Sequence, residues 1–400
     1  MALLIKGGRL VDPASSMDAL RDVRIRDGAI AEIGADLVPR DDEAVLDAAG
    51  AVVAPGFVDM HVHLRDPGFP EKETLESGTE AAVRGGFTTV ACMPNTSPAL
   101  DDAAILSDLQ REIGRRARCR VFPIAAITRS RKGEQPCDFP ALAQAGAVAF
   151  SDDGDMVRDV RVLQDAAARA NRIPRPFVSH CNDPEEDSVA RDLQVAEKTA
   201  KAWHIAHIST ASALERVTAA RRRGIHVTCE VTPHHLTFTS ALTLTAGPPA
   251  TVNPPLRSEA DVQAMLQGVR DGTIDAFASD HAPHTDREKS GEDGPAAPGF
   301  SGLEVAVGAY AAALPDLPIL RFVELISTNP ARILGLRGGT LSVGGPADVT
   351  IFADRPWVVD PSEFASKGKC TPFAGRTLPR RVLVTIVGGE MRYRDPKLSG

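Results

Sequence analysis

The sequence lacks three features that would assign the protein to particular classes. It has no surplus of basic residues: 53 acidic and 45 basic residues give a formal net charge of −8. This balance argues against a nucleic acid or an anionic membrane surface as the main partner. No run of about 18 apolar residues is present, so no membrane span is predicted. The apolar stretch before Lys6 is too short for a signal peptide, and the expected location is the cytoplasm.

The cysteines show no Cys-x-x-Cys pairing. The six are scattered through apolar segments, at Cys92, Cys119, Cys137, Cys181, Cys229 and Cys370. This distribution is typical of reduced, mostly buried thiols in a cytosolic protein. No disulfide framework is therefore predicted.

The chain is long and apolar enough for one large domain and a smaller one, with 400 residues of which 43% are hydrophobic. Near both ends, short alternating apolar segments are broken by Gly and Asp. These segments predict strands and hairpins, with residues 26–28 (RDG) as one turn. Both ends of the chain are expected to be rich in β-structure.

Between the two ends, short apolar runs alternate with helical patterns. Eight such runs occur, at residues 57–63, 88–93, 121–126, 147–150, 176–179, 204–208, 225–230 and 275–279. Helices are expected between them, for example over 184–201 and over 212–223, the latter with Ser212 as its N-cap. Eight strand-then-helix units predict an α/β protein with a (β/α)8 barrel.

The first of these runs ends in His-x-His. In an extended strand, residues i and i+2 share a face, so Phe57, Asp59, His61 and His63 are predicted to point the same way. Two imidazoles on one face can reach a single ion. A lone His-x-His is more often explained by hydrogen bonds to its neighbours, so the metal interpretation depends on residues further along the chain.

Other histidines and aspartates also fall at the ends of predicted strands, where the active sites of barrel enzymes lie. The complete set is His61, His63, Asp153, His180, His207 and Asp280. Mixed imidazole and carboxylate ligands suit zinc, or a similar ion such as Co²⁺ or Mn²⁺, better than calcium or an iron–sulfur centre. Six ligands exceed what one tetrahedral ion accepts. We therefore predict two divalent ions with one bridging carboxylate.

Several motifs resemble class I dihydroorotases of the amidohydrolase superfamily. They are PGFVDMHVHLR at 55–65, MPNT at 93–96, FSDDG at 150–154, EVTPHHL at 230–236, NPPLR at 253–257, SDHAPH at 279–284 and GKCTPF at 368–373. The resemblance covers essentially the whole chain. It implies a TIM-like metal-dependent hydrolase barrel over residues 55–340 and a small β-sandwich domain built from residues 1–54 and 341–400.

The resemblance also implies an activity, the reversible cyclisation of N-carbamoyl-L-aspartate to L-dihydroorotate in pyrimidine synthesis. Two zinc ions per chain would be held by the set above: His61, His63, Asp153 and Asp280 around one, and Asp153, His180 and His207 around the other. Many relatives bridge the metals with a carbamylated lysine, but none of the nine lysines here lies at a predicted strand end. Asp153 is therefore the expected bridge. Asp152, on the opposite face, is expected to be an orienting or structural carboxylate.

Catalysis would use a hydroxide between the ions, with Asp280 moving protons as general acid and base. The substrate carries an α-carboxylate, which the guanidinium of Arg65 can bind through two hydrogen bonds. Asn95 and His284 are its expected companions. By family resemblance, the pyrimidine ring would be held by Asn253 and by the backbone at Pro298 and Gly299.

The remaining histidines are not predicted to be site residues. We expect His204 to pack against a helix and His226 to lie at a strand start away from the site. His234 and His235 are expected to have structural or supporting roles, and His281 to support Asp280. The segment 291–299 is either a mobile loop beside the site or a surface linker.

One departure from the family pattern keeps alternatives open. Class I dihydroorotases carry a longer segment between the positions of His180 and His207, whereas here 181–184 (CNDP) leads almost directly into a helix. One alternative is a weakly active or inactive homologue that acts as a structural partner of aspartate transcarbamoylase. Another is hydrolysis of a different cyclic amide, as in allantoinases, hydantoinases and dihydropyrimidinases. For the enzyme, the expected partners are a small-molecule substrate and a second copy of the chain, and a complex with the transcarbamoylase is a further arrangement.

Overall fold

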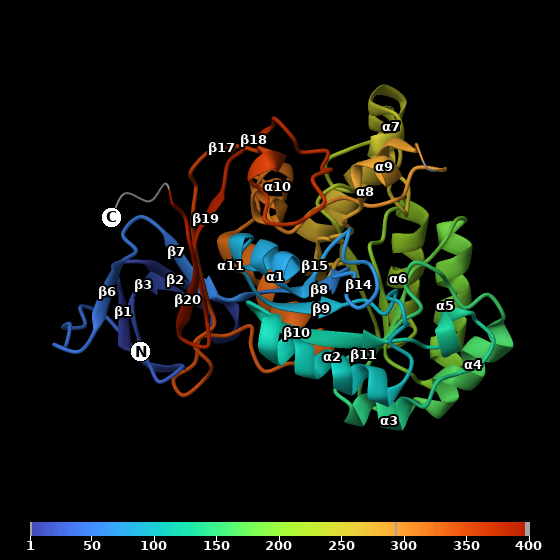
Figure 1. Cartoon of the computed structure of the whole chain (residues 1–400), viewed down its shortest axis with the longest axis horizontal. Coiled ribbons are helices and arrows are strands. Elements are labelled where there is room, and N and C mark those ends of the chain that lie inside the picture. Colours follow the sequence, from blue (N-terminus) through green and yellow to red (C-terminus); the bar gives the residue numbers. More distant parts are fainter. Residues whose placement is uncertain (1, 293, 397–400) are drawn as a thin grey trace.

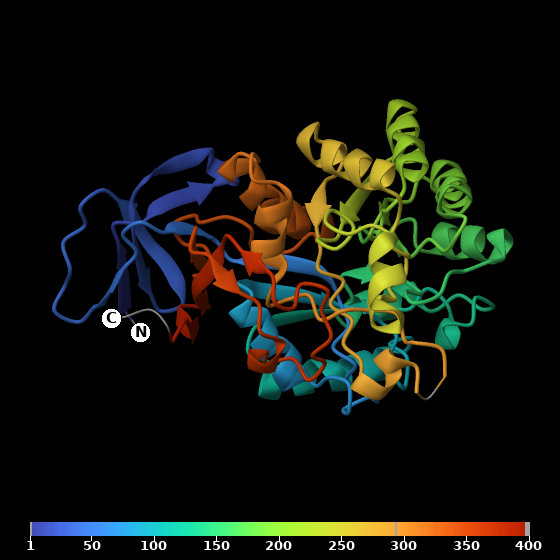
Figure 2. The ribbon, with the colours of Figure 1, turned by 90° about the horizontal axis from the view of Figure 1, so that it is seen from above.

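The computed structural model describes residues 2–292 and 294–396. A parallel barrel surrounded by helices lies beside a pair of sheets built from the two ends of the chain (Figure 1). In the view from above, the N-terminal strands lie to one side of the barrel and the green and yellow helices lie on the far side (Figure 2). The predicted fold class is confirmed.

The barrel sheet runs in chain order from β8 to β15, and every neighbouring pair is parallel. In the described chain its eight strands are β8 (Phe57–Val62), β9 (Phe87–Cys92), β10 (Arg120–Ala125), β11 (Ala149–Phe150), β12 (Phe177–Ser179), β13 (Trp203–Ile205), β14 (Val227–Val231) and β15 (Ala276–Phe277). The ring closes where the amide of His63 donates to the carbonyl of His281 over 2.8 Å. All eight predicted strands are present, each within a few residues of its expected bounds.

Helices follow the strands, and most of them cover the outside of the barrel (Figure 1). They are α1 (Leu75–Arg84), α2 (Ala103–Arg116), α3 (Phe139–Gln144), α4 (Val160–Arg169), α5 (Glu185–Thr199), α6 (Ala211–Arg222), α7 (Ala241–Ala246), α8 (Glu259–Arg270), α9 (Asp286–Ser290), α10 (Ala306–Ala313), α11 (Ile319–Val323) and α12 (Asn329–Leu334). The predicted N-cap of α6 is wrong by two residues. Thr210, not Ser212, has extended backbone and accepts a hydrogen bond from the amide of Ala213, which caps the helix.

Two further sheets come from the ends of the chain. The first has the order β5-β4-β1-β6 and the second β20-β19-β16-β7-β2-β3. The strands are β1 (Ala2–Lys6), β2 (Arg9–Asp12), β3 (Met17–Leu20), β4 (Asp22–Arg26), β5 (Ala29–Gly34), β6 (Ala44–Asp47), β7 (Val52–Pro55), β16 (Val349–Ala353), β19 (Arg381–Val387) and β20 (Glu390–Arg394). Asp27 and Gly28, both with positive φ, form the predicted turn between β4 and β5.

The two terminal sheets share one hydrophobic core, with contributions from Ile5, Ile25, Val53, Ile351 and Ile386. This shared core is what makes them a sandwich. The division of the chain at residues 54 and 341 stays a prediction. Part of the C-terminal segment, including β17 (Trp357–Val358) and β18 (Thr377–Leu378), contributes to a different apolar cluster with residues between β14 and α10.

Strand β8 does not alternate as the sequence suggested. Phe57 packs against Phe87, Phe322 and Phe352 outside the barrel, with ring centroids 5.6–6.5 Å apart, whereas His61 points into the barrel toward Asp153. The prediction that the two residues share a face is wrong. The pairing of β8 with β9 shifts register between Phe57 and Val58 and again between Asp59 and Val62, which breaks the two-residue period.

The cysteine prediction is confirmed. All six thiols are free, and five of them are buried, with Cys370 partly exposed. Among residues 2–292 and 294–396, no helix combines the length and the apolar character needed to span a bilayer.

Candidate metal centre

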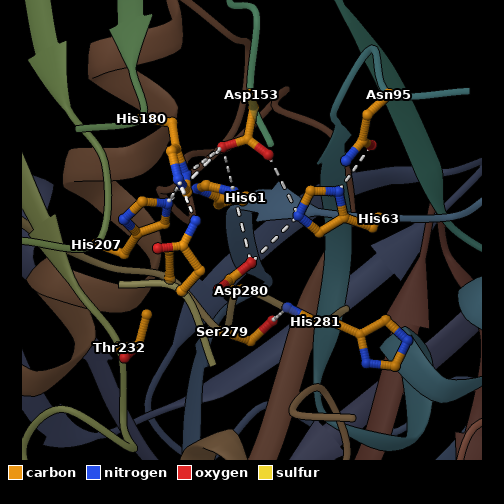
Figure 3. A network of polar contacts seen from close by, with 12 residues as sticks. His61, His63, Asn95, Asp153, His180, His207, Thr232, Ser279, Asp280 and His281 are labelled. Carbon is orange, nitrogen blue, oxygen red and sulfur yellow. Dashed lines mark hydrogen bonds and ion pairs between the residues drawn. The ribbon is translucent and has the colours of Figure 1, made fainter. Parts of the chain in front are cut away.

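Six side chains converge at the carboxyl ends of the barrel strands (Figure 3). They are the predicted ligands His61, His63, Asp153, His180, His207 and Asp280, and all six are buried. His61 lies in strand β8 and His63 directly follows it, and the others follow β11, β12, β13 and β15. The barrel brings together residues that are up to 219 positions apart in the sequence.

Asp153 lies at the centre of this cluster. Its Oδ1 is 3.3 Å from Nε2 of His61, 3.4 Å from Nδ1 of His180 and 3.7 Å from Nε2 of His207. Its Oδ2 is 3.5 Å from Nε2 of His63. The carboxylate therefore faces both halves of the cluster, which is the geometry expected of a bridging ligand.

Asp280 approaches the cluster from the opposite side of His61 and His63. Its Oδ1 lies 3.2 Å from Nε2 of His63 and 3.6 Å from Nε2 of His61. The contacts are drawn as dashed lines in Figure 3. Two sets of potential ligand atoms each lie within 4.8 Å of one another: His61, His63 and Asp280, and His61, Asp153 and His207.

These atoms fit divalent metal ions. Nε2 of His61 and Oδ1 of Asp153 are buried and have no hydrogen-bond partner in the described chain, although they face each other. Buried polar atoms are rarely left in this condition without an ion or a ligand. Imidazole nitrogen and carboxylate oxygen are also the donors that zinc and related ions accept.

The electrostatics favour a cation as well. Burial alone would raise the pKa values of Asp153 and Asp280, but the surrounding histidines lower both well below the ordinary value. Burial lowers the pKa values of His63 and His207, which favours the neutral imidazole that binds metals. The site therefore combines ionised carboxylates with neutral imidazoles at His63 and His207, whereas the carboxylates of Asp153 and Glu230 raise the pKa of His61 despite its burial.

Outer contacts hold three of the imidazoles. Nδ1 of His61 contacts Oε1 of Glu230 at 2.8 Å, and Nδ1 of His63 contacts Oδ1 of Asn95 at 2.8 Å. Nε2 of His180 lies 3.1 Å from Oδ1 of Asn182. Sequence reasoning assigned no role to Glu230 or Asn182. One indication of a role for Glu230 was available in the sequence, since it is a charged residue inside an otherwise mostly apolar predicted strand.

A cavity of about 150 Å³ opens beside the cluster. Every predicted substrate residue lines it: Arg65, Asn95, Asn253, His284, Pro298 and Gly299. Nδ2 of Asn253 lies 2.9 Å from Nε2 of His180, which ties one cavity wall to the cluster. The volume suits a small metabolite and not a polymer.

Arg65 is the main fixed cation of this cavity, although only 8% of its surface is exposed. Its Nε donates to the carbonyl of Pro283 over 3.2 Å, and its Nη2 lies 3.1 Å from Nε2 of His284. Among the described residues, no carboxylate lies within 4.0 Å of its guanidinium. Burial lowers the pKa of Arg65 to about 10, so the group stays charged at neutral pH. A buried cation without an anion is suited to an anionic ligand.

Three residues at this site have left-handed backbone: Arg65 (φ 58°), His207 (φ 32°) and Asp280 (φ 47°). Side chains other than glycine seldom adopt this conformation, and it concentrates at functional sites. Here it turns each side chain toward the cluster or the cavity just beyond a strand end.

Comparison with known proteins agrees with this geometry. The family model described as Amidohydrolase family matches residues 52–392, which include the whole cluster and cavity. The chain belongs to the amidohydrolase family.

Curated relatives of this amidohydrolase carry the name dihydroorotase, which agrees with the resemblance found in the motifs. The protein of Pelotomaculum thermopropionicum is 45% identical over 425 aligned positions, covering 99% of each chain. The proteins of Syntrophus aciditrophicus and Aquifex aeolicus are 41% and 38% identical, each covering 99% of this chain and 100% of the relative. These alignments are longer than the 400 residues of this amidohydrolase, so the relatives contain insertions relative to it.

Solved structures of similar fold include hydantoinases. The L-hydantoinase of Arthrobacter aurescens superposes with a TM-score of 0.89 at 25% identity, covering 97% of this chain and 95% of that one. A D-hydantoinase gives a TM-score of 0.89 at 21% identity, covering 100% and 97%. At 21% identity, the second likeness concerns the fold alone.

The predicted position of His204 is wrong. Instead of packing against a helix, it points into the amidohydrolase barrel, where its Nε2 lies 3.2 Å from Oε2 of Glu230 and its Nδ1 2.7 Å from Oγ1 of Thr228. Its neighbours Trp203 and Ile205 pack outward with the helix-covered core. His204 therefore shares the inward face of its strand, and the bend at His207 (φ 32°) lets His207 also face the cluster.

The other histidines lie outside the cluster. His226 is exposed just before β14. His234 packs against the rings of His235 and Phe300, and His235 contacts Oγ1 of Thr232 at 2.8 Å and the carbonyl of Pro254 at 3.0 Å. These contacts agree with the expected supporting roles.

Two residues adjacent to cluster members have structural contacts. His281 contacts Oε2 of Glu73 over 3.2 Å through Nε2 and accepts from the amide of Gly302 through Nδ1. Asp152 accepts hydrogen bonds from the amides of Ile127 and Thr128 at 2.8 and 3.0 Å. Asp152 thus anchors the loop after β10, as the structural interpretation predicted.

The glycine-rich segment 291–299 includes residue 293, which lies outside the described residues. Its last part is tied to the amidohydrolase core: the amide of Ala297 donates to the carbonyl of Glu288 over 2.9 Å, and the amide of Gly299 donates to the carbonyl of Thr251 over 3.1 Å. Lys289 Nζ donates to the carbonyls of both Thr251 and Ala297. The cavity wall at Pro298 and Gly299 is therefore anchored, and mobility of the segment stays a prediction.

The segment after His180 is short, as the sequence indicated. Only residues 181–184 separate His180 from α5. The segment is nevertheless held in place beside the site. Asn182 contacts His180, and the carboxylate of Asp183 pairs with Arg257 at 2.5 Å. The short segment leaves the six-residue cluster intact.

Proposed function

We propose that this amidohydrolase is a dihydroorotase, which interconverts N-carbamoyl-L-aspartate and L-dihydroorotate. The observation that carries the proposal is the buried guanidinium of Arg65 in the cavity beside the cluster, which has no carboxylate within 4.0 Å among the described residues. Hydantoins and dihydropyrimidines have no carboxylate to neutralise this group, whereas dihydroorotate has one. The relatives named dihydroorotase support the same substrate.

The proposed cofactor is a pair of divalent ions, with zinc as the expected metal. His61, His63 and Asp280 would hold one ion, His180 and His207 the other, and Asp153 would contact both. When bound, such ions lower the pKa of water and polarise a carbonyl group.

Substrate orientation would come from the cavity wall. Arg65 would bind the α-carboxylate through its fork of N–H donors. Because Oδ1 of Asn95 is engaged by His63, its Nδ2 remains as a donor for the same carboxylate. Burial and the charge of Arg65 lower the pKa of His284 to about 3, so its imidazole is neutral and adds no second charge. Asn253 and the backbone at Pro298 and Gly299 would hold the ring.

Asp280 is the proposed general acid and base. It lies at the boundary of the cluster and the cavity, and its carboxylate is ionised at neutral pH. In hydrolysis it would accept the proton of the attacking water and deliver it to the ring nitrogen that leaves. In synthesis it would take a proton from the ureido nitrogen, so one carboxylate serves both directions.

The test compares substrates on purified protein. Hydrolysis of L-dihydroorotate, followed by ultraviolet absorbance, should exceed that of hydantoin, allantoin and dihydrouracil by at least about 10²-fold in kcat/KM. Preference for a substrate without a carboxylate would overturn the proposal. Metal binding without turnover of any of these substrates would favour the alternative of an inactive homologue that acts as a structural partner of aspartate transcarbamoylase.

We also propose that the enzyme is a cytoplasmic homodimer, with aspartate transcarbamoylase as a candidate partner. Both arrangements follow from the resemblance to class I dihydroorotases. Analytical ultracentrifugation of the chain alone, and then with a transcarbamoylase, separates the two. A monomer that is fully active would contradict the dimer.

A further inference from the structure

Glu230, near the end of β14, lies between two histidines inside the barrel. Its Oε1 is 2.8 Å from Nδ1 of His61, and its Oε2 is 3.2 Å from Nε2 of His204. All three side chains are fully buried. Of these residues, only His61 faces the proposed metal site.

The first contact fixes the state of His61. An ionised carboxylate can only accept, so the proton of a neutral His61 must sit on Nδ1. The lone pair of the ring then lies on Nε2, the atom that faces Asp153 and Asp280 at 3.3 and 3.6 Å. Glu230 therefore selects the tautomer in which His61 can bind a metal ion.

The second contact holds Glu230 itself. Nδ1 of His204 lies 2.7 Å from the hydroxyl of Thr228, which can donate to it. The proton of a neutral His204 then sits on Nε2, on the side of Oε2 of Glu230. The contact is close but is not aligned as a hydrogen bond, since neither atom has a hydrogen-bond partner in the described chain. The N–H of His204 thus stabilises the buried negative charge of Glu230 electrostatically.

The other imidazoles of the cluster have weaker support. His63 and His180 contact the neutral amides of Asn95 and Asn182. Nδ1 of His207 is buried and has no hydrogen-bond partner within the described residues. A carboxylate behind a metal-binding histidine increases its donor strength more than an amide does. Within the described residues, His61 is therefore the one imidazole of the four whose outward nitrogen contacts a carboxylate.

From these contacts we propose that Glu230 and His204 are positioning residues for the metal centre: Glu230 orients and strengthens His61 as a ligand, and His204 keeps Glu230 in place. The proposal rests on the proposed metal-dependent function. These roles account for two fully buried polar residues that take no part in the reaction itself. Burying a carboxylate inside a barrel lowers the stability of the fold unless neighbouring groups compensate its charge.

The experiment measures zinc affinity of the whole protein by competition with a chromophoric chelator, without substrate. Glu230→Gln keeps an acceptor but removes the charge, and should weaken zinc binding about 10-fold; Glu230→Leu removes both and should weaken it up to about 100-fold. His204→Leu should weaken binding, and His204→Gln, which retains a donor for Glu230, should weaken it less. The matched control is Asp22→Asn, another buried carboxylate that binds two main-chain amides in the terminal sheets.

A second readout separates positioning from folding. The visible absorption spectrum of Co²⁺-loaded protein should change in Glu230→Gln but not in Asp22→Asn, while circular dichroism shows both variants folded. Zinc affinities within about twofold of wild type in folded Glu230→Gln and His204→Leu would overturn the proposal. Because no substrate is involved, a failure to hydrolyse dihydroorotate would count against the proposed function and not against this inference.

Discussion

Nη2 of Arg65 lies 3.1 Å from Nε2 of His284, so the buried guanidinium contacts an imidazole where a carboxylate would be the usual partner. Nε2 of His284 also lies 3.0 Å from the carbonyl of Pro298. A single ring nitrogen cannot accept from Arg65 and donate to Pro298 at the same time. The arrangement therefore leaves donors of Arg65 available for an anionic ligand.

Substitution of Arg65 should mainly affect substrate binding. Arg65→Lys keeps the charge but loses the fork, and should raise KM for L-dihydroorotate by about 10-fold; Arg65→Met should raise it by at least about 100-fold. Steady-state kinetics measure the effect. Arg111→Lys, at an exposed position of the outer helix α2, is the control and should leave KM unchanged. An unaltered KM in Arg65→Met would refute the assigned role.

Asp280→Asn should lower kcat by about 10² to 10⁴ while the variant keeps bound zinc, because five of the six cluster residues remain. Asp153→Asn should instead lose metal as well as turnover, since its carboxylate faces both halves of the cluster. Elemental analysis beside turnover separates the two effects. Equal metal loss in both variants would mean that the lost turnover of Asp280→Asn follows from lost metal, which would remove the evidence for proton transfer.

Phe57 should be important for stability and not for chemistry. It joins the barrel to the C-terminal sheet through Phe87, Phe322 and Phe352 and has no exposed surface. Phe57→Ala should lower the free energy of unfolding by about 3–5 kcal/mol, and Phe57→Leu by less. Chemical denaturation of the metal-free protein tests this. A loss below about 1 kcal/mol in Phe57→Ala would contradict the packing described.

Glu304 should make stability depend on pH. Burial raises the pKa of Glu304 to about 7, although hydrogen bonds from the amides of Ala365 and Ser366 act to lower it. Between about pH 4.5 and 7 the folded protein then binds a proton that the unfolded chain has lost, so stability falls as pH rises through this window. Relative to Glu304→Gln, the wild type should lose up to about 3 kcal/mol between pH 5 and pH 8. The free energies of unfolding of both proteins at the two pH values provide the measurement, and a constant difference between them would be evidence against the shift.

The barrel and its six-residue cluster were predictable from the sequence for one reason. Strand order fixes which loops meet in a parallel barrel, so a histidine or aspartate after each strand must approach the same rim. Asp153 and His207 could be assigned to the cluster without knowing any distance. The same rule placed Arg65 and Asn95 on the cavity wall.

Side-chain direction within the strands was less predictable. The register shifts in β8 separate Phe57 from His61, although simple alternation puts them on one face. His204 and His207, three apart, both point inward because the backbone turns left-handed at His207. Bulges and positive φ values depend on packing between distant strands, and a local pattern carries little information about them. For this reason the link from His61 through Glu230 to His204 emerged only from the structure.

The most direct test of a two-metal dihydroorotase is a titration of the metal-free protein with zinc, recording hydrolysis of L-dihydroorotate at each step. Each bound ion should be held by its own part of the cluster, with Asp153 between them. Turnover should be absent without metal and should rise until about two equivalents of zinc are bound per chain. Full activity without metal, or no activity at two bound equivalents, would contradict a two-metal dihydroorotase.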